Sequence, residues 1–199
     1  MAQSAQAEVR TVTLREAEKS IRRAMRRKRP VFVWGPPGIG KSDLMEQITA
    51  TFNKGWLIDL RMALMEPTDI RGIPYYNQVE NTMSWAHPVD LPTEAQAAEH
   101  DIVILFLDEL NSAPMATQAA AYQLVLNRRI GTYKLPDNCV IVAAGNRETD
   151  RGVTYRMPSP LANRFVHIEV AADFDVWQEW AVEHEVHPDV LGHLTFAKT

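Results

Sequence analysis

The sequence has one cysteine, no long hydrophobic run and no excess of positive charge, and each shortage excludes a class of protein. A single cysteine cannot form an internal disulfide, so Cys139, inside the apolar run Asn138–Ala144, is interpreted as a core thiol. The longest apolar runs are far shorter than the ~20 residues that cross a bilayer, and the polar start has no signal-peptide core. A formal net charge of −4 argues against a generally basic nucleic-acid binder. These shortages favour a cytoplasmic protein without a membrane segment.

The remaining composition is that of an ordinary globular protein. Hydrophobic residues make up 46% and charged residues 23% of the 199 residues, which is enough to bury a sizeable core. The length fits one domain, or one domain followed by the start of another. Residues 1–10 are small and polar and are expected to form a flexible N-terminus.

A phosphate-binding pattern, G-x-x-x-x-G-K-[ST], is present as Gly35-Pro36-Pro37-Gly38-Ile39-Gly40-Lys41-Ser42. Its context fits, because a buried strand is expected over Pro30–Trp34 and a helix over Asp43–Phe52. Glycines let backbone N–H groups surround phosphates, Lys41 can reach the β- and γ-phosphates, and the Ser42 hydroxyl can ligate Mg²⁺. The implied ligand is a nucleoside triphosphate with Mg²⁺. The alternative is a plain Gly/Pro turn, which the Lys-Ser ending disfavours.

Apolar runs that alternate with helical patterns predict an α/β fold, a parallel sheet with helices on both faces. Five strands are expected, at residues 30–34, 56–60, 101–109, 140–144 and 165–170. The third run is apolar throughout and ends in two acids, which is typical of a central strand buried on both faces. Ligands should bind beyond the carboxyl ends of such strands.

Capping signals and proline positions predict where the helices begin. Thr13 and Glu16 have capping-box spacing before a helix that should run to about Lys28. Ser112 is expected to cap a later helix that has Pro114 in its first turn and closes before Gly131. A short helix should open at Ser159-Pro160 and carry Asn163 and Arg164. From Asp173 onward the pattern is helical, with Trp177 and Trp180 interpreted as the core of a lid and a second helix starting near Pro188.

The segment between the second and third strands is broken by prolines. Glu66–Arg71 is expected to form a short helical turn, and Tyr75–Trp85 a hairpin with a polar tip. A hairpin inserted between core strands either contacts a substrate or partner or is decoration, and the residues leave both open.

Three strand ends should converge on one site. Asp108 is expected to hold Mg²⁺, and Glu109 to polarise an attacking water. Asn146 follows the next strand, where it either bonds the γ-phosphate or the water or serves as a turn residue after Gly145.

Four ordered motifs together resemble the AAA+ ATPases, and specifically the MoxR-like group. They are the phosphate loop, Leu105–Glu109, Ala144–Asn146 and Leu161–Phe165. The resemblance implies an AAA+ nucleotide-binding domain over 11–171, with an inserted hairpin at about 74–86, and the beginning of a truncated helical lid at 172–199. It also implies ATP hydrolysis, a sensor-one role for Asn146, and an Arg164 finger that enters the site of a neighbouring subunit in a ring, expected to be a hexamer. The second sensor arginine of such lids is not assigned, because neither Arg151 nor Arg156 sits in a lid helix.

Two functions from different classes are compatible with these motifs. The first is a ring-forming ATPase or chaperone that remodels a protein partner, which for MoxR-like proteins is often one with a von Willebrand factor A domain. The second is a nucleotide-gated binding module with little turnover that acts on nucleic acid through the basic face Arg22–Arg29, itself interpreted as a solvated helix face. The intact set of catalytic residues favours the first. A small-molecule kinase is disfavoured because it needs no trans-acting arginine, and the histidines of the last two helices are interpreted as surface or lid-packing residues: His184, His187 and His193.

Overall fold

The computed structural model describes residues 11–147, 150, 155, 157 and 162–197. Several predictions made from the sequence fall outside the described residues. They concern the flexible N-terminus at 1–10, the helix opening at Ser159-Pro160, Leu161 of the last motif, and both Arg151 and Arg156.

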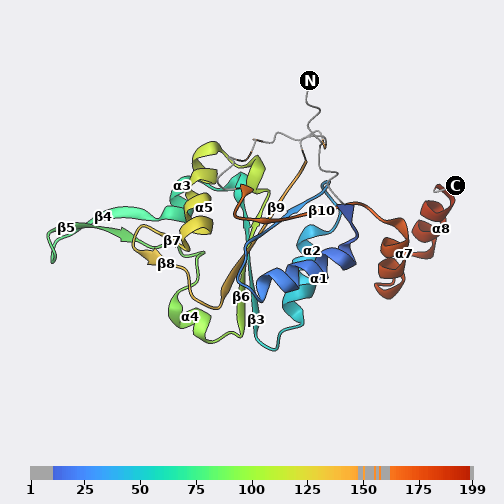
Figure 1. Ribbon diagram of the computed structural model, residues 1–199, viewed down its shortest axis with the longest axis horizontal. Coiled ribbons are helices and arrows are strands. Elements are labelled where there is room, and N and C mark those ends of the chain that lie inside the picture. Colours follow the sequence, from blue (N-terminus) through green and yellow to red (C-terminus); the bar gives the residue numbers. More distant parts are fainter. Residues whose placement is uncertain (1–10, 148–149, 151–154, 156, 158–161, 198–199) are drawn as a thin grey trace, which may run out of the picture.

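A parallel sheet of six strands forms the centre of the molecule, in the order β1-β10-β2-β9-β6-β3 (Figure 1). The strands are β1 (Thr11–Val12), β2 (Val31–Trp34), β3 (Gly55–Arg61), β6 (Ile102–Asp108), β9 (Cys139–Gly145) and β10 (Val166–Val170). All five neighbouring pairs are parallel. The expected fold class is confirmed, but the count of five strands is wrong by one. β1 has only two residues, which is too short for a pattern of alternation to show in the sequence.

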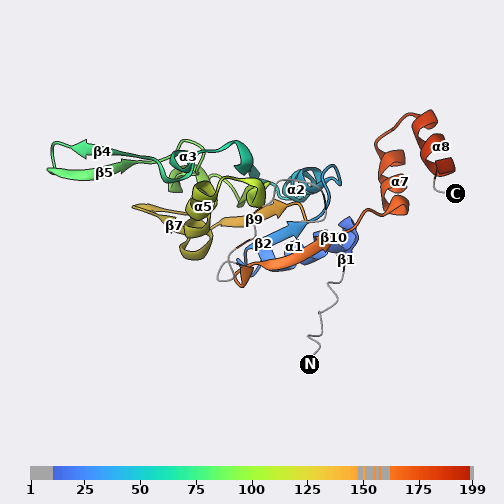
Figure 2. The same ribbon diagram turned by 90° about the horizontal axis from the view of Figure 1, so that it is seen from above.

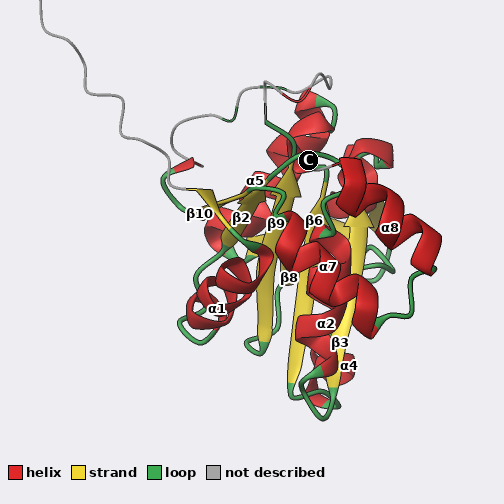
Figure 3. Ribbon diagram, turned by 90° about the vertical axis from the view of Figure 1, so that its right-hand side faces the viewer, coloured by secondary structure: helices red, strands yellow, loops and turns green. Residues whose placement is uncertain are grey.

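Helices cover both faces of this sheet (Figures 2 and 3). One face packs against α1 (Leu14–Met25) and α2 (Lys41–Ala50). The other packs against α3 (Pro67–Arg71), α4 (Glu94–Ala98) and α5 (Met115–Asn127). Along β6, Ile104 and Phe106 face the first layer and Leu105 and Leu107 the second, and all four are at most 1% exposed. The strand is therefore buried on both faces, as its unbroken apolar run predicts.

The capping box at the start of α1 is confirmed. The Glu16 amide donates to Thr13 Oγ1 at 3.3 Å, and the Thr13 amide donates to Glu16 Oε2 at 3.2 Å. The helix ends at Met25 rather than near Lys28, which adopts a left-handed conformation with φ of 51°. α2 begins at Lys41, earlier than predicted, because the left-handed Gly40 is its N-cap. It ends at Ala50, two residues before the predicted end.

The predicted cap of α5 is wrong. Ser112 ends a 3₁₀ turn, η2 (Leu110–Ser112), in which its amide donates to the Glu109 carbonyl at 2.9 Å. Pro114 itself is the N-cap, with an extended ψ of 144°, and the first helical residue is Met115. A proline restricts the residue before it to extended conformations, so Ala113 cannot continue a helix begun at Ser112.

The predicted hairpin is confirmed as β4 (Ile73–Asn77) and β5 (Thr82–Ala86), which project away from the body of the molecule (Figures 1 and 2). The short turn at Glu66–Arg71 is α3, which follows a 3₁₀ turn, η1 (Met62–Leu64). The sequence analysis missed α4 and a small hairpin of β7 (Arg129–Ile130) and β8 (Tyr133–Lys134).

Two helices follow the last strand, as the helical pattern after Asp173 predicts. They are α7 (Phe174–Glu183), which Asp173 caps, and α8 (Pro188–Ala197). Ala181 is the buried residue of α7, and α8 has none. In the described part of the chain, every helix is too short or too polar to cross a membrane.

Cys139 provides a test of the core. It is fully buried at the start of β9, and burial raises the pKa of its thiol to about 12. Because only the thiolate reacts with disulfide reagents, we expect no labelling by dithionitrobenzoate in the native state at pH 8 and labelling of one thiol per chain in 6 M guanidinium chloride. Rapid native labelling would contradict the placement of β9 in the core.

Candidate active site

The phosphate-binding pattern forms a loop between β2 and α2, at the edge of the sheet where the strands have their carboxyl ends (Figure 3). Two of its glycines have positive φ, 75° at Gly38 and 91° at Gly40, a conformation that other residues rarely adopt. Because Gly40 caps α2 without a side chain, the first N–H groups of this helix remain available to an anion.

Lys41 is the first residue of α2 and is only 9% exposed. Its ammonium donates to the carbonyls of Gly35 and Pro36, at 2.8 and 3.0 Å, and to Asn146 Oδ1 at 3.2 Å. Burial lowers the pKa of Lys41, and the nearby carboxylates of Asp108, then Asp150 and Glu109, oppose that effect. Among the described residues no carboxylate is recorded within ion-pair distance of this ammonium. A buried cation that is held by neutral oxygens is well suited to an anionic ligand.

Ser42 and Asp108 meet beside the loop, as the sequence predicts. The Ser42 hydroxyl donates to Asp108 Oδ2 at 3.3 Å, which joins the start of α2 to the end of β6. These two oxygens can hold Mg²⁺ only with additional ligands, and Mg²⁺ typically takes those from phosphates and water. Within the described ranges, no group of three or more His, Cys, Asp and Glu side chains could hold a metal ion by itself.

Glu109 follows directly and turns the chain out of the sheet. Its backbone is left-handed, with φ of 53° and ψ of 33°, and its amide donates to Asp108 Oδ1 at 2.9 Å. A non-glycine residue in this conformation costs about 1–3 kcal/mol, and such strain is concentrated at functional sites. The side chain is exposed at the edge of the loop, where it can contact water.

Asn146 is fixed by a residue that the sequence analysis missed. The side chain of Asn111, 2% exposed, donates to the Asn146 carbonyl at 2.7 Å and accepts from the Asn146 amide at 3.2 Å. A Cβ atom at Gly145 would collide with the Asn111 side chain and lie 2.8 Å from Phe32 Cζ, so the close approach requires glycine. Asn146 is thereby aimed at Lys41 by a pair of hydrogen bonds to its backbone.

A second buried polar residue, Gln118, holds the backbone of Asn111 by a hydrogen bond. Gln118 of α5, 1% exposed, donates to the Ala113 carbonyl at 2.9 Å and to the Asn111 carbonyl at 3.4 Å. The Tyr122 hydroxyl donates to Gln118 Oε1, and burial raises the pKa of that hydroxyl to about 12. A glutamine on the buried side of an otherwise apolar helix is the sequence signal that could have indicated this network.

Arg147 links the same strand end to β10. Its guanidinium pairs with Asp150 at 3.0 Å and with Glu169 at 3.1 Å. The hydrogen bonds from the Arg147 side chain to Asp150 hold the pKa of that carboxyl below its usual range. The chain after β9 is therefore anchored to the sheet on the side of Asn146.

Arg164 is not brought together with the other predicted site residues. It is exposed on a turn just before β10, at the amino-terminal end of the strands, whereas the phosphate loop lies at their carboxyl end. Val166 pairs with Val31 and Glu169 with Trp34, so Arg164 and Gly35 differ by six positions along the strand direction. At ~3.3 Å per residue they are separated by about 20 Å.

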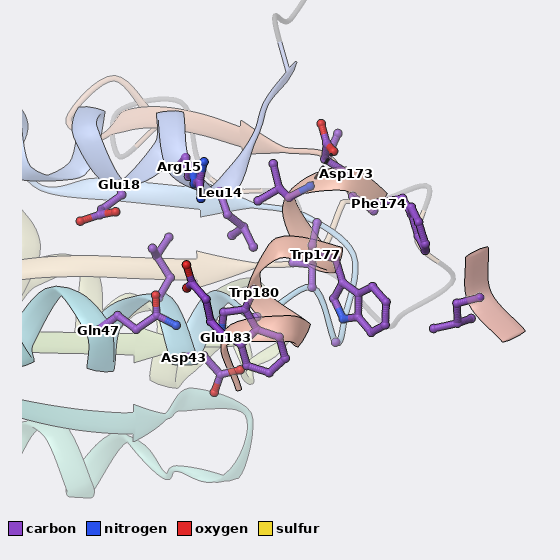
Figure 4. A pocket seen from close by; sticks show the side chains of 18 residues that line it. Leu14, Arg15, Glu18, Asp43, Gln47, Asp173, Phe174, Trp177, Trp180 and Glu183 are labelled. Carbon is purple, nitrogen blue, oxygen red and sulfur yellow. Dashed lines mark hydrogen bonds between the residues drawn. The ribbon is translucent and has the colours of Figure 1, made fainter. Parts of the chain in front are cut away.

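A pocket of about 690 Å³ lies beside the loop, lined by α1 and α2 on one side and by α7 with Leu194 of α8 on the other. Figure 4 shows Leu14 and Arg15 of α1 on one side and Trp177 and Trp180 of α7 on the other. The interpretation of these two tryptophans as lid core is wrong, because both are half-buried and line the pocket. Arg15 pairs with Glu179 at 2.6 Å across the two helices, although both side chains are exposed.

Comparisons with known proteins agree with this fold. Residues 30–165 match the family model of the AAA domain, dynein-related subfamily. The chain is 28% identical over 158 residues to midasin of Giardia intestinalis, covering 75% of this chain and 3% of that protein. It is similar to the crystal structure of a candidate ATPase from Cytophaga hutchinsonii (TM-score 0.63, 17% identity, 89% of this chain and 52% of the other). It is also similar to NtrX from Brucella abortus (TM-score 0.54, 18% identity, 93% and 46%). The chain thus spans about half the length of these two structures.

The hydrogen bonds of Asn111 can be tested by replacement with leucine. Asn111→Leu keeps the branched shape of the side chain but leaves the Asn146 amide and carbonyl without partners, so the free energy of unfolding should fall by about 2 kcal/mol. Exchange of the Asn146 amide hydrogen should also become faster in the native state. Asn138→Leu is the matched control, because Asn138 donates to the carbonyls of Ala97 and His100 away from the site. Equal exchange at Asn146 in both variants would contradict the assigned pair of hydrogen bonds.

Proposed function

We propose that this chain, which belongs to the dynein-related subfamily of AAA domains, binds ATP with Mg²⁺ and hydrolyses it. The observation that carries the proposal is the buried Lys41 ammonium, which neutral oxygens hold inside a glycine loop at the start of a helix. This is the arrangement that the terminal phosphates of a nucleotide require. The match of residues 30–165 to the AAA model supports it.

In the bound state, the residues Gly35–Ser42 would surround the phosphates with backbone N–H groups, and Lys41 would contact the β- and γ-phosphates. Ser42 and Asp108 would hold Mg²⁺, which neutralises phosphate charge when bound. The base would occupy the pocket beside the loop, because this pocket is lined by Gly38 and Gly40 and by the rings of Trp177 and Trp180. Such rings offer apolar faces on which a purine can stack.

Hydrolysis needs a base near the γ-phosphate and a group that orients the water. The Glu109 carboxylate accepts the proton of the attacking water. Its left-handed backbone and exposed side chain support this role, because they leave the carboxylate accessible to water beside the loop. The Asn146 side-chain amide, which Asn111 fixes through the backbone, hydrogen-bonds the γ-phosphate or the water. The Asn146 Oδ1 contact with Lys41 supports this position.

Arg164 acts in a neighbouring subunit, within a ring that we infer to be a hexamer. The separation of about 20 Å between Arg164 and its own loop supports this role, since no side chain spans that distance. The exposed turn that carries Arg164 is free to face a second copy. A guanidinium delivered in this way stabilises the charge of the transition state.

The ring couples hydrolysis to the remodelling of a protein partner, as expected for a chaperone of MoxR-like type. The projecting β4–β5 hairpin supports a partner-contacting role, because it exposes Tyr75, Tyr76 and Met83. We infer that residues 11–171 form the nucleotide-binding domain and that 172–199 begin its helical lid. A protein with a von Willebrand factor A domain is the partner class that the MoxR-like resemblance favours. The buried thiol of Cys139 is compatible with the cytoplasm.

Glu109→Gln and Lys41→Ala separate hydrolysis from binding. Gln keeps the size of Glu109 but cannot accept a proton, so ATP should still bind while steady-state phosphate release falls about 10²-fold or more. Lys41→Ala is the control for binding, since it removes the cation that faces the phosphates and should weaken ATP affinity. Affinity is measured by calorimetry with Mg²⁺ present. Unchanged phosphate release in Glu109→Gln would remove Glu109 from the mechanism, and unchanged affinity in Lys41→Ala would contradict the phosphate loop.

Mixed rings test whether Arg164 acts in trans. Rings of Arg164→Ala subunits alone should be nearly inactive, because loss of such an arginine costs about 10³-fold or more. Rings of Lys41→Ala subunits alone should also be nearly inactive, because the phosphate loop lacks its cation. In the mixture, some interfaces combine an intact loop with an intact Arg164, so activity should partly return. Analytical ultracentrifugation shows whether the two variants assemble. No recovery in rings that do form would refute the shared site.

A further inference from the structure

The side chain of His167, on β10, makes two hydrogen bonds that reach opposite ends of the parallel strands. One partner, Trp34, lies at the carboxyl end of β2, and the other, Ala162, precedes the start of β10. Its Nδ1 atom lies 2.8 Å from Trp34 Nε1, and its Nε2 atom lies 2.7 Å from the Ala162 carbonyl oxygen. An indole N–H can only donate and a carbonyl can only accept, so Nδ1 accepts and Nε2 carries the hydrogen. Both contacts are therefore made by one neutral tautomer of the imidazole.

The Ala162 carbonyl closes the turn that presents Arg164. It also accepts from the Phe165 amide at 3.3 Å, with Asn163 and Arg164 as the two residues in between. Phe165 is 6% exposed, and its ring packs edge-on against Phe32 with centroids 5.4 Å apart. The backbone that carries Arg164 is thus held by Phe165 from within the core and by His167 from the strand that follows.

The other end of this connection is the residue directly before the phosphate loop. Trp34 ends β2, and the loop begins at Gly35. The indole stacks on Phe32 with centroids 4.1 Å apart, and it lies nearly parallel to the imidazole of His167, 17° between planes. Because the indole is packed in this way, it gives His167 a fixed donor rather than a mobile one.

We propose that His167 is a positioning residue for Arg164: by bridging Trp34 and the Ala162 carbonyl, it holds the turn of the arginine at a fixed place relative to the core of its own subunit. This inference rests on the trans role of Arg164 proposed above. A long, exposed side chain reaches a partner's phosphate reproducibly only if its backbone is fixed, and a misplacement of 1 Å can cost about 10²-fold in rate. The effect of His167 should therefore be felt in the neighbouring subunit's site and not in its own.

Mixed rings distinguish these two sites. In a mixture with Arg164→Ala subunits, Lys41→Ala subunits contribute to activity only through Arg164, because their own loop is inactive. His167→Ala is placed in the Lys41→Ala subunit in one mixture and in the Arg164→Ala subunit in the other. Phosphate release is compared with the mixture of the two single variants, and ultracentrifugation confirms that rings form.

We expect the recovered activity to fall about tenfold or more when His167→Ala is in the Lys41→Ala subunit, and to be unchanged when it is in the Arg164→Ala subunit. Trp34→Phe in the Lys41→Ala subunit removes the donor but keeps an aromatic ring, and should lower the recovery in the same direction by less. Val166→Ala is the matched control. It lies on the same strand with its side chain on the opposite face, and it should leave the recovery intact.

Three results would overturn the proposal. Equal recovery with and without His167→Ala in the Lys41→Ala subunit means that Arg164 needs no such support. Loss only when His167→Ala is in the Arg164→Ala subunit means that the imidazole acts on its own loop through Trp34. Loss in both mixtures indicates a general role in folding or assembly. If instead the reference mixture of single variants recovers nothing, the trans role of Arg164 fails, and that failure is recognised without any His167 variant.

Discussion

The parallel register of β2, β9 and β6 is the constraint on which the candidate site depends. Trp34 is level with Gly145, and Leu107 is level with Ala143. The three strands therefore end within about two positions of one another, and the residues that follow them meet although they are distant in the sequence. A register shift of one residue would turn every side chain of a strand to the other face. The buried apolar residues on both faces of β6 and β9 resist such a shift, so the two hydrophobic cores also hold the polar site together.

The groups around the Lys41 ammonium favour the binding of an anionic ligand over an ion pair within the protein. A carboxylate in contact with Lys41 would neutralise the ammonium and compete with a phosphate, whereas carbonyl and amide oxygens hold it without cancelling its charge. Asp108 and Glu109 are near enough to stabilise the charged form of Lys41, but Asp108 is engaged with the Ser42 hydroxyl and the Glu109 amide. Asp108 is thus held by hydrogen bonds from the Ser42 hydroxyl and the Glu109 amide rather than by an ion pair with Lys41.

The sequence predicted those parts of the fold and site that have a local signal. Apolar runs identified the long strands, the Thr13–Glu16 spacing identified the start of α1, and the glycine-rich loop identified Lys41 and Ser42. Two of the features that were missed, the role of Asn111 and the strand β1, depend on contacts between distant segments. Asn111 binds a residue 35 positions away, and its burial could not be inferred from its neighbours. β1 pairs with β10, which is distant in the sequence, whereas the Ser112 cap is displaced because a local turn uses that residue first.

Side chains of β10 contact residues at both ends of the parallel strands. On one face, Glu169 pairs with Arg147 beside Asn146, and His167 bonds Trp34 beside the phosphate loop. The same strand begins immediately after the turn of Arg164. In the proposed ring, each copy of β10 would therefore contact the surroundings of its own nucleotide and support the arginine that reaches the next one. β10 pairs with β2 along Val166–Glu169, and with β1 at Glu169 and Val170. The loop and the backbone of Arg164 are thus connected through the side-chain contacts of this one strand, with Trp34 at one end and the Ala162 carbonyl at the other.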